Sequence, residues 1–315
     1  MEGNLGLRIA QAVPTLLLVS VLVFGLQQLM PGDPAMVLAG EDRGDPVVVA
    51  QIRAELWLDR SLPEQYGRWL WNALHGNLGY SWRGRQPVAE LIAQKLPVTA
   101  QLGAMAFVIA VCIGVPAGIV AAVYRNRPLD YAANAVGLAG LSTPNFWLGI
   151  MLILLVSVEL GWLPPSGYVP PSEDWRQSLA TTIMPAFVLG NAIAAILMRH
   201  TRSAMLGALD QDFVRTARAK GLGEFPVVLR HALRNALIPV VTLGALELGT
   251  LLSGAVLTEQ VFSIPGFGKM VVDAVFNRDY PVVQGVVLVT ATLYILLNLL
   301  ADILYVAINP KLRGA

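Results

Sequence analysis

Six long apolar segments divide the chain, and each is long enough to cross a lipid bilayer. A membrane-spanning helix needs about 20 mainly apolar residues. The segments that meet this requirement are 9–29, 98–123, 131–158, 179–198, 236–258 and 282–308. The second, third and fourth carry no charge, the fifth contains only Glu247, and the last contains only Asp302. The pattern therefore predicts an all-α integral membrane protein of about six transmembrane helices.

The amino-acid composition supports this interpretation and excludes a soluble enzyme. Hydrophobic residues make up 55% of the chain and charged residues only 14%, whereas soluble domains carry roughly 25% charged residues. The formal net charge of +1 gives no indication of a nucleic-acid partner. The single cysteine, Cys112, lies in an apolar segment and has no second cysteine for an internal disulfide.

The first apolar segment has an alternative interpretation, a cleavable signal peptide. It is longer than the apolar core of such a peptide, which is roughly 7–15 residues. The sequence Met-Pro-Gly-Asp-Pro at 30–34 also does not resemble a small-residue cleavage site. We therefore expect residues 1–30 to form an N-terminal tail and a retained first transmembrane helix.

The distribution of Lys and Arg predicts that both termini lie in the cytoplasm. Six spans place both termini on one side, and basic residues accumulate in cytoplasmic loops. With the long segment 31–97 left out, twelve basic residues would lie inside and three outside. The inside residues are Arg8, Arg125, Arg127, Arg199, Arg202, Arg215, Arg218, Lys220, Arg230, Arg234, Lys311 and Arg313, and the outside residues are Arg176, Lys269 and Arg278. The sequence therefore predicts an N-in, C-in topology with an extended periplasmic segment at 31–97.

This periplasmic segment contains two amphipathic stretches. Val48, Ile52 and Leu56 recur at helical spacing, and Tyr66 and Trp69 belong to a second, aromatic stretch. Aromatic residues near a membrane surface usually form an interfacial belt. The same residues could instead form a surface that docks an external partner, and the sequence leaves both interpretations open.

Several of the expected spans contain helix-interrupting residues. The sequence Gly-Val-Pro-Ala-Gly occupies 114–118, Pro144 follows Ser142 and Thr143, and Pro185 lies early in the fourth span. Proline and glycine are tolerated in membrane helices because neighbouring groups satisfy the freed backbone atoms. Broken helices also line the pathways of transporters, so these positions are consistent with either role.

The cytoplasmic segment between the fourth and fifth spans is predicted to form two short helices. The first ends at Gly221, which suits a left-handed position, and the second begins near Pro226 and runs to Pro239. Phe213, Ala217 and Leu222 would share one apolar patch, ringed by the basic residues Arg215, Arg218 and Lys220. Such a segment either lies on the anionic inner leaflet or inserts into a groove on another protein. Physical reasoning alone leaves both open.

Several motifs, in order along the chain, resemble the permease subunits of ABC transporters, in particular the dipeptide, oligopeptide and nickel permease family. The cytoplasmic segment carries Arg-Thr-Ala-Arg-Ala-Lys-Gly at 215–221 and Arg-His-Ala-Leu-Arg-Asn-Ala-Leu-Ile-Pro at 230–239. The other motifs are Met-Pro-Gly-Asp-Pro at 30–34, Gly-Asn-Leu-Gly-Tyr-Ser at 76–81, Pro-Val at 87–88, Phe-Ser-Ile-Pro-Gly-Phe-Gly at 262–268, Arg-Asp-Tyr-Pro-Val-Val at 278–283 and Ala-Ile-Asn-Pro at 307–310. Arg215 stands where the general permease signature has glutamate, a variant that is usual for the peptide branch.

The resemblance implies a type I ABC importer permease fold and a set of partners. We expect a second homologous permease that forms a heterodimer with this chain, two ABC ATPase subunits that bind ATP and Mg, a periplasmic substrate-binding protein, and membrane lipid. The chain has no Gly-x4-Gly-Lys-Ser/Thr phosphate loop. We therefore expect a permease in the cell inner membrane with no catalytic residue, no bound metal and no cofactor of its own, and no nucleic-acid partner.

The resemblance also assigns roles to segments. It implies a periplasmic segment at 31–97, a five-helix permease core at 98–308 and a cytoplasmic tail at 309–315. Within the core, residues 199–238 would form the coupling loop, which contacts an ATPase. The coupling residues would be Phe213, Arg215, Thr216, Ala217, Arg218, Ala219, Lys220, Gly221, Leu222 and Arg230. Candidates for the translocation pathway are Pro144, Asn145 and Glu247.

Two other function classes fit the sequence less well. An ion-driven secondary transporter would use ionisable groups inside the membrane, and Glu247 and Asp302 are the candidates. A membrane-embedded enzyme would need clustered catalytic residues, whereas His75, His200 and His231 are scattered. Among substrates, a di- or oligopeptide or a peptide-like solute such as glutathione is favoured. Nickel or a metallophore complex is the alternative, because the family carries both.

Overall fold

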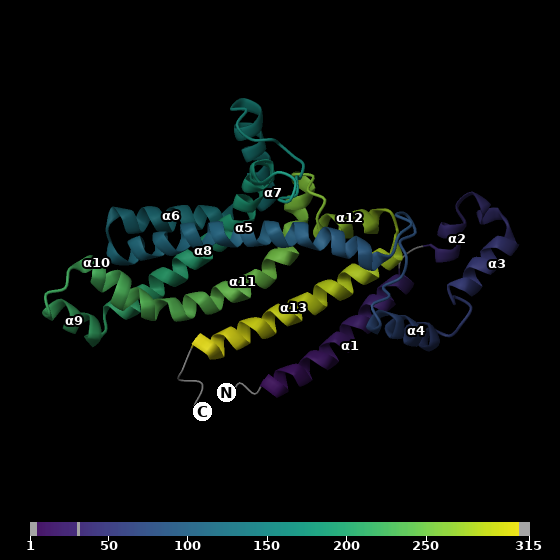
Figure 1. Ribbon diagram of the computed structural model, residues 1–315, viewed down its shortest axis with the longest axis horizontal. Coiled ribbons are helices and arrows are strands. Elements are labelled where there is room, and N and C mark those ends of the chain that lie inside the picture. Colours follow the sequence, from purple (N-terminus) through teal and green to yellow (C-terminus); the bar gives the residue numbers. More distant parts are fainter. Residues whose placement is uncertain (1–4, 30–31, 309–315) are drawn as a thin grey trace. The chain divides into compact units, whose positions relative to one another are not determined.

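The computed structural model describes residues 5–29 and 32–308, and this part of the chain is helical (Figure 1). Its β-structure is limited to one isolated bridge, between Tyr80 and Pro87. The elements are α1 (Leu5–Leu29), α2 (Pro34–Ala39), the 3₁₀-helix η1 (Gly40–Gly44), α3 (Pro46–Glu55), α4 (Leu62–Leu74), α5 (Val88–Val123), α6 (Pro128–Ser142), α7 (Asn145–Leu152), the π-helix η2 (Ile153–Glu159), α8 (Trp175–Leu209), α9 (Asp212–Ala219), α10 (Glu224–Pro226), the π-helix η3 (Val227–Ala232), α11 (Leu233–Val261), α12 (Phe267–Phe276) and α13 (Tyr280–Ile308). The predicted all-α fold is confirmed.

Within the described residues, five helices are long and apolar enough to cross a membrane, and a bent helix pair supplies a sixth candidate span. The described helices extend beyond several of the predicted apolar segments. α5 begins at Val88 rather than near residue 98, and α8 reaches Leu209. Hydropathy marks only the apolar part of a helix, so charged and polar turns at its ends are missed. The predicted tail 309–315 and the side chain of Asp302 lie outside what the structure describes.

The chain divides into two compact units. The core unit comprises Met1–Leu5, Leu96–Lys269 and Tyr294–Ala315, and the N-terminal unit comprises Gly6–Lys95 and Met270–Leu293. In the core unit, α8 lies beside both α6 and α11 (Figure 1). Its apolar centre includes Leu102 from α5, Leu197 from α8 and Val240 from α11.

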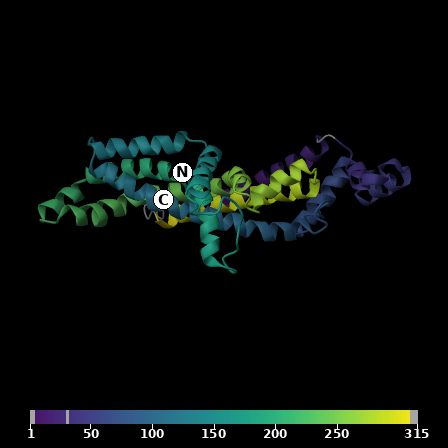
Figure 2. The ribbon, with the colours of Figure 1, turned by 90° about the horizontal axis from the view of Figure 1, so that it is seen from above.

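The third predicted span, 131–158, is broken at proline. The axes of α6 and of the α7–η2 segment meet at 101°, and α7 and η2 leave the neighbouring helices of the core unit (Figures 1 and 2). A residue before proline is driven out of the helical region. Thr143 accordingly has an extended backbone, with ψ 121°, and its hydroxyl donates to the Ala139 carbonyl. Pro144 therefore ends α6 and caps α7.

The other two expected interruptions are wrong. α5 is one helix through residues 114–118, and α8 is one helix through Pro185. The glycines in α5 serve close packing instead. A β-carbon placed on Gly114 would lie 2.5 Å from the Ala194 carbonyl oxygen of α8, and one on Gly118 would lie 2.6 Å from the Met198 carbonyl oxygen. Small residues let two membrane helices approach each other in this way.

The same contact continues towards the other end of the two helices. A β-carbon on Gly190 of α8 would lie 2.5 Å from the Ala106 carbonyl oxygen of α5. Ala106 and Ala110 are fully buried and precede Gly114 at four-residue spacing, which places them on one face of the helix. Ala106, Ala110, Gly114 and Gly118 therefore form one stripe against α8, which we call the small-residue stripe.

A buried carboxylate fixes the turn between α11 and α12. Glu259 is fully buried; it accepts hydrogen bonds from the Thr99 hydroxyl and, at 2.7 Å, from the Lys269 amide. A β-carbon on Gly266 would lie 2.2 Å from Glu259 Oε1, and one on Gly268 would lie 2.9 Å from Val256. This contact explains why the Phe-Ser-Ile-Pro-Gly-Phe-Gly motif needs glycine at both positions.

In the N-terminal unit, a second buried carboxylate joins two motifs that are far apart in the sequence. Asp279, directly before α13, accepts the Ser81 hydroxyl at 2.6 Å and the backbone amides of Trp82 and Arg83 at 3.2 Å each. The Trp82 ring lies 5.1 Å from the ring of Tyr280. The 76–81 and 278–283 motifs therefore form one structure.

The aromatic residues of the segment 31–97, which the sequence predicts to be periplasmic, divide between packing and surface. Tyr66 and Trp69 of α4 both contact Phe24 of α1, with ring centroids 5.5 and 6.0 Å apart. The Tyr66 hydroxyl also bonds to Ser20 at 2.8 Å. Trp71 is exposed. Part of the predicted aromatic stretch thus holds α4 against α1, and only the remainder is free to meet lipid or a partner.

The glycine contacts lead to a prediction with a matched control on the same helix. Gly190→Ala drives a methyl group into the α5 backbone, and overpacking of this kind costs about 1–3 kcal/mol. Gly207, also on α8, has open space around its α-carbon, so Gly207→Ala should stabilise the helix by about 0.5–1 kcal/mol. Thermal unfolding of both variants in detergent should therefore shift in opposite directions. Equal unfolding temperatures would contradict the close contact.

Candidate functional site

The predicted coupling loop lies at one end of the core unit, where α9 and α10 project beyond the helices that carry them (Figures 1 and 2). One face of α9 is buried within the chain itself. Val214 and Ala217 pack against Val227 and Val228 of η3. The full cluster comprises Ala122, Met205, Ala208, Val214, Ala217, Val227, Val228, Ala232 and Ala236. The loop is therefore a packed structure rather than a flexible connection.

This packing corrects the apolar patch expected from the sequence. Ala217 is 5% exposed and faces the interior, whereas Phe213 and Leu222 are 40% and 41% exposed. The three residues do not share one exposed face. A helix of eight residues can bury either of two faces, and the buried one is set by η3 and α8. Those elements come from other parts of the sequence.

Gly221 closes α9 as predicted. Its φ of +81° is left-handed, the Gly221 amide donates to the Arg218 carbonyl, and the Leu222 amide donates to the Ala217 carbonyl. These two bonds form a Schellman motif, which favours glycine at this position. A β-carbon there would meet open space, so a substitution would strain the backbone without a clash inside the chain.

The basic residues of the loop are exposed, and one of them joins its two arms. Arg218 of α9 donates to both carboxylate oxygens of Glu224 of α10, at 2.8 and 3.1 Å. These bonds raise the pKa of the Arg218 guanidinium above its usual range. Arg215 pairs with Asp212 at 3.3 Å. Both pairs are solvent-exposed, so each contributes little stability.

The remaining predicted coupling residues also lie on this surface. Thr216, Ala219, Lys220 and Arg230 are all exposed, and the Thr216 hydroxyl donates to the Asp212 carbonyl. Sequence reasoning missed Phe225, which is 76% exposed and the most open large apolar side chain of the loop. Its position after Gly221 and before Pro226, outside the apolar periodicity of α9, is the signal that could have identified it.

The second arm of the loop does not end at Pro239 as expected. The helical run begins at Glu224, passes through the π-helical η3 and continues through Pro239 to Val261. Short π-helical segments within α-helices occur frequently at functional sites. Because no break separates η3 from α11, a displacement of the exposed arm would pass directly into a candidate membrane span.

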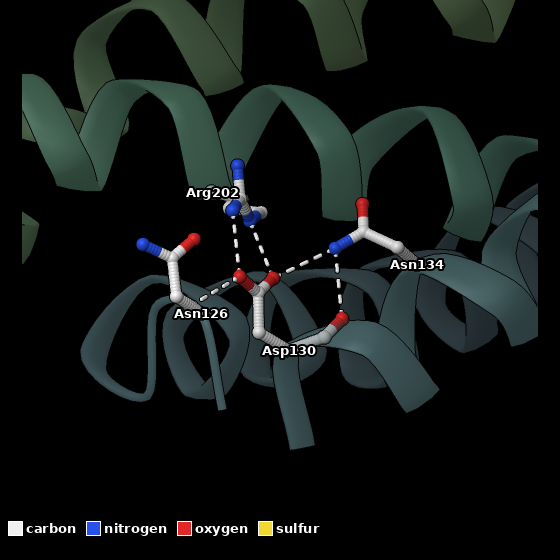
Figure 3. Close-up of polar contacts among 4 residues, drawn as sticks. All are labelled: Asn126, Asp130, Asn134 and Arg202. Carbon is white, nitrogen blue, oxygen red and sulfur yellow. Dashed lines mark hydrogen bonds and ion pairs between the residues drawn. The ribbon is translucent and has the colours of Figure 1, made fainter. Parts of the chain in front are cut away.

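A buried ion pair anchors the helix that leads into the loop (Figure 3). Arg202 of α8 donates its Nε and Nη2 groups to the two carboxylate oxygens of Asp130, each at 2.7 Å. Asp130 also accepts hydrogen bonds from the backbone amide of Asn126 at 2.9 Å and from the side-chain amide of Asn134 at 2.7 Å. Asp130 is almost fully buried. The sequence showed Arg202 only as one of the inside basic residues, because its partner is 72 residues away.

The three predicted pathway residues do not gather in one site. A hollow of about 390 Å³ at the α6–α7 break is lined by Pro144, together with Ala139, Ser142, Thr143, Phe146 and Trp147. Asn145 and Glu247 do not line this hollow. Glu247 lies on α11 and is half-buried. Within the residues that the structure describes, no group of three or more His, Cys, Asp or Glu side chains is arranged to hold a metal ion.

Comparison with known proteins gives a consistent result along the whole chain. Residues 114–314 match the family described as binding-protein-dependent transport system inner membrane component, and residues 4–103 match the family described as its N-terminal membrane component. A putative peptide transport system permease protein of Brucella abortus is 44% identical over 306 residues, and the dipeptide permease DppB of Escherichia coli K12 is 43% identical over 329. The glutathione permease GsiC of Escherichia coli O6:H1 is 45% identical over 306 residues. Each alignment covers 97% of both chains.

A solved structure supports the fold alone. An inward-facing form of the MetNI methionine ABC transporter is 19% identical, with a TM-score of 0.59. The match covers 70% of this chain and 96% of that one. The chain therefore has the fold of an ABC importer permease.

The anchor at Asp130 generates a prediction. Arg202→Met leaves a buried carboxylate with only its two asparagine partners, and breaking a buried pair costs up to about 3–5 kcal/mol. Arg199→Met removes an exposed arginine from the same helix and should change stability by less than about 0.5 kcal/mol. Thermal unfolding in detergent should separate the two variants. Replacing Asp130 by Asn in the Arg202→Met background should recover part of the loss, and an Arg202→Met variant as stable as Arg199→Met would show that the pair is not an anchor.

Proposed function

The chain belongs to the family of binding-protein-dependent transport system inner membrane components, and on this premise we propose that it conducts short peptides into the cell. It is a permease of an ABC transporter in the inner membrane, not an ATPase, and the family implies no cofactor for it. Its work requires an ATPase and other transporter subunits. We propose that these are a second homologous permease, two ABC ATPases and a periplasmic binding protein.

The relatives support a peptide as the substrate. Those that are 43–45% identical over nearly the whole chain are named for peptides, for dipeptides and for glutathione. These solutes share an amide bond with free terminal charges. A dipeptide or oligopeptide, or a peptide-like solute such as glutathione, is therefore the proposed cargo, with nickel or a metallophore as the alternative.

The proposed mechanism rests on the exposure of one arm of the coupling loop, the arm that begins at Glu224 and continues into α11. In the N-in, C-in topology that we propose, this arm would stand in the cytoplasm. Its inner face is packed, while Phe225 remains exposed, as do Phe213 and Leu222 of the neighbouring α9 arm, among basic residues. Large apolar side chains on a water-facing surface usually mark an interaction site. The arm would insert into a groove of an ATPase subunit, and its continuity with α11 would carry nucleotide-driven closure into the membrane.

The pathway itself would form between the two permeases. Pro144, which creates the α6–α7 break, together with Asn145 and Glu247, remain the proposed lining residues. An ionisable group inside a membrane span is a functional candidate, and Glu247 would meet the cationic end of a peptide. A broken helix would supply backbone groups to the solute.

The coupling mechanism predicts the effect of removing Phe225. Truncating a well-buried aromatic anchor at a protein interface costs about 2 kcal/mol or more, which is more than tenfold in affinity. Phe225→Ala should therefore weaken ATPase association and abolish stimulation of ATP hydrolysis by the loaded binding protein. Phe276→Ala, which removes an equally exposed phenylalanine from α12, is the matched control.

Both variants should insert normally, and transport must be compared at equal membrane abundance. If the arm instead lies on the lipid surface, one exposed change would shift membrane affinity only slightly. Wild-type transport and full coupling in Phe225→Ala would therefore rule out the proposed coupling role.

The substrate proposal is tested in cells. Loss of the gene for this chain should reduce uptake of a labelled dipeptide to background, and complementation should restore it. Excess unlabelled dipeptide should compete, whereas excess nickel should not. A strain that keeps full peptide uptake but loses nickel uptake would overturn the peptide proposal and favour the metal alternative.

A further inference from the structure

The N-terminal unit contains a half-open cavity of about 280 Å³ that has no assigned role. All of its lining residues belong to this unit, from α1, the start of α2, the end of α3 with residues 56–58, α4, the 77–82 loop and the start of α13. Five aromatic residues line it: Phe24, Trp57, Trp69, Tyr80 and Trp82. Side-chain amides line it as well, from Gln27, Gln65, Asn72, Asn77 and Gln284. An apolar wall with a few polar groups is typical of a small-molecule site.

One wall of the cavity is held in a strained conformation. Trp57 has a φ of +60°, a left-handed value that is rare for a bulky residue. It closes α3 in a Schellman motif, because the Leu58 amide donates to the Arg53 carbonyl and the Trp57 amide to the Ala54 carbonyl. Glycine, which Gly221 supplies in the same motif after α9, would fit without strain. Trp57 thus occupies a glycine position and contributes a flat ring to the cavity, with the Arg68 guanidinium 3.9 Å from the ring centroid.

The polar groups of the cavity are incompletely satisfied. Gln284 is 6% exposed, and its Nε2 group has no hydrogen-bond partner among the residues that the structure describes. A buried donor without a partner is costly, and such groups in native structures require an explanation. Glu55 and Arg68 also line the cavity. In the described part of the chain neither of them has an ion-pair partner.

We propose that this cavity binds a short zwitterionic peptide. Arg68 would pair with the terminal carboxylate and Glu55 with the terminal ammonium, because each side chain carries the charge opposite to that terminus. Gln284 lines the cavity, and its buried Nε2 group would donate to a peptide carbonyl once the side chain turns towards the bound peptide. The aromatic walls would cover apolar side chains. The volume lies just below the roughly 300–1,000 Å³ of drug-sized pockets, which suits two or three residues.

The substrate class in this proposal rests on the proposed function, and the location is new. In the proposed topology the cavity would face the periplasm, so it would hold a peptide outside the membrane before the peptide enters the pathway. A protein loop offers amides and side chains but no free termini. The charged termini therefore distinguish a free peptide from a segment of a docked protein.

The test uses the complete transporter without its binding protein, reconstituted in lipid nanodiscs. Titration calorimetry with alanyl-phenylalanine should give saturable binding. The same dipeptide with its termini acetylated and amidated should bind at least about tenfold more weakly. Glu55→Gln and Arg68→Gln should each weaken binding of the free dipeptide to a similar degree. Glu41→Gln, an exposed acid outside the cavity, is the matched control and should bind like the wild type.

Gln284→Leu gives a signature that a purely structural role would not produce. Replacing an unsatisfied buried amide by an apolar group of similar size should raise the unfolding temperature of the empty transporter while weakening peptide binding. A lower unfolding temperature, binding that is unchanged in all three variants, or equal binding of free and blocked dipeptides would each overturn the proposal. A transporter that imports peptides in cells but shows no such binding would refute this site and leave the proposed function intact.

Discussion

The close approach of α5 and α8 is the constraint on which the core unit depends. Inside a membrane, lipid tails are as apolar as leucine, so burial of apolar surface gives helices little reason to associate. Association must come instead from van der Waals contact between the helix backbones. The backbones can approach closely only where the facing residues are small. The small-residue stripe on α5 and Gly190 on α8 meet this requirement. With α8 fixed in this way, α6 and α11 pack along it.

Charged and hydrogen-bonding side chains lie around this apolar centre. Asp130 and Arg202 join α6 to the end of α8 that leads into the predicted coupling loop. Glu259 and Thr99 join α11 to α5 at the opposite end of the span. Both carboxylates receive several hydrogen bonds, which buried charges require. The apolar middle and the polar ends thus have separate tasks: the middle sets the distance between helices, and the ends set how they align.

The sequence alone was sufficient to predict the features that depend on residues close together in the chain. The six apolar segments, the left-handed turn at Gly221 and the break at Pro144 each follow from residues next to one another. It was insufficient to predict the features that are determined by contacts with residues far away in the chain. The glycines at 114 and 118 look like a helix interruption until α8 is placed against them, and the inward direction of Ala217 depends on η3. The continuity of the helix through Pro239 depends on neighbouring groups that satisfy the backbone. The cavity around Trp57 was not foreseen, because its lining comes from six separate stretches of the chain.

The unbroken helical run from Glu224 to Val261 has a geometric consequence for the transport cycle. At about 1.5 Å per residue, its length is roughly 55 Å, well beyond the roughly 30 Å thickness of the hydrocarbon core. One rigid rod therefore ends in the exposed arm on one side and in the buried Glu259 clamp on the other. A tilt imposed at either end must appear at both at once. In the proposed mechanism, a tilt of this rod at the exposed arm would therefore also displace its Glu259 end, so the two ends of the span would move together.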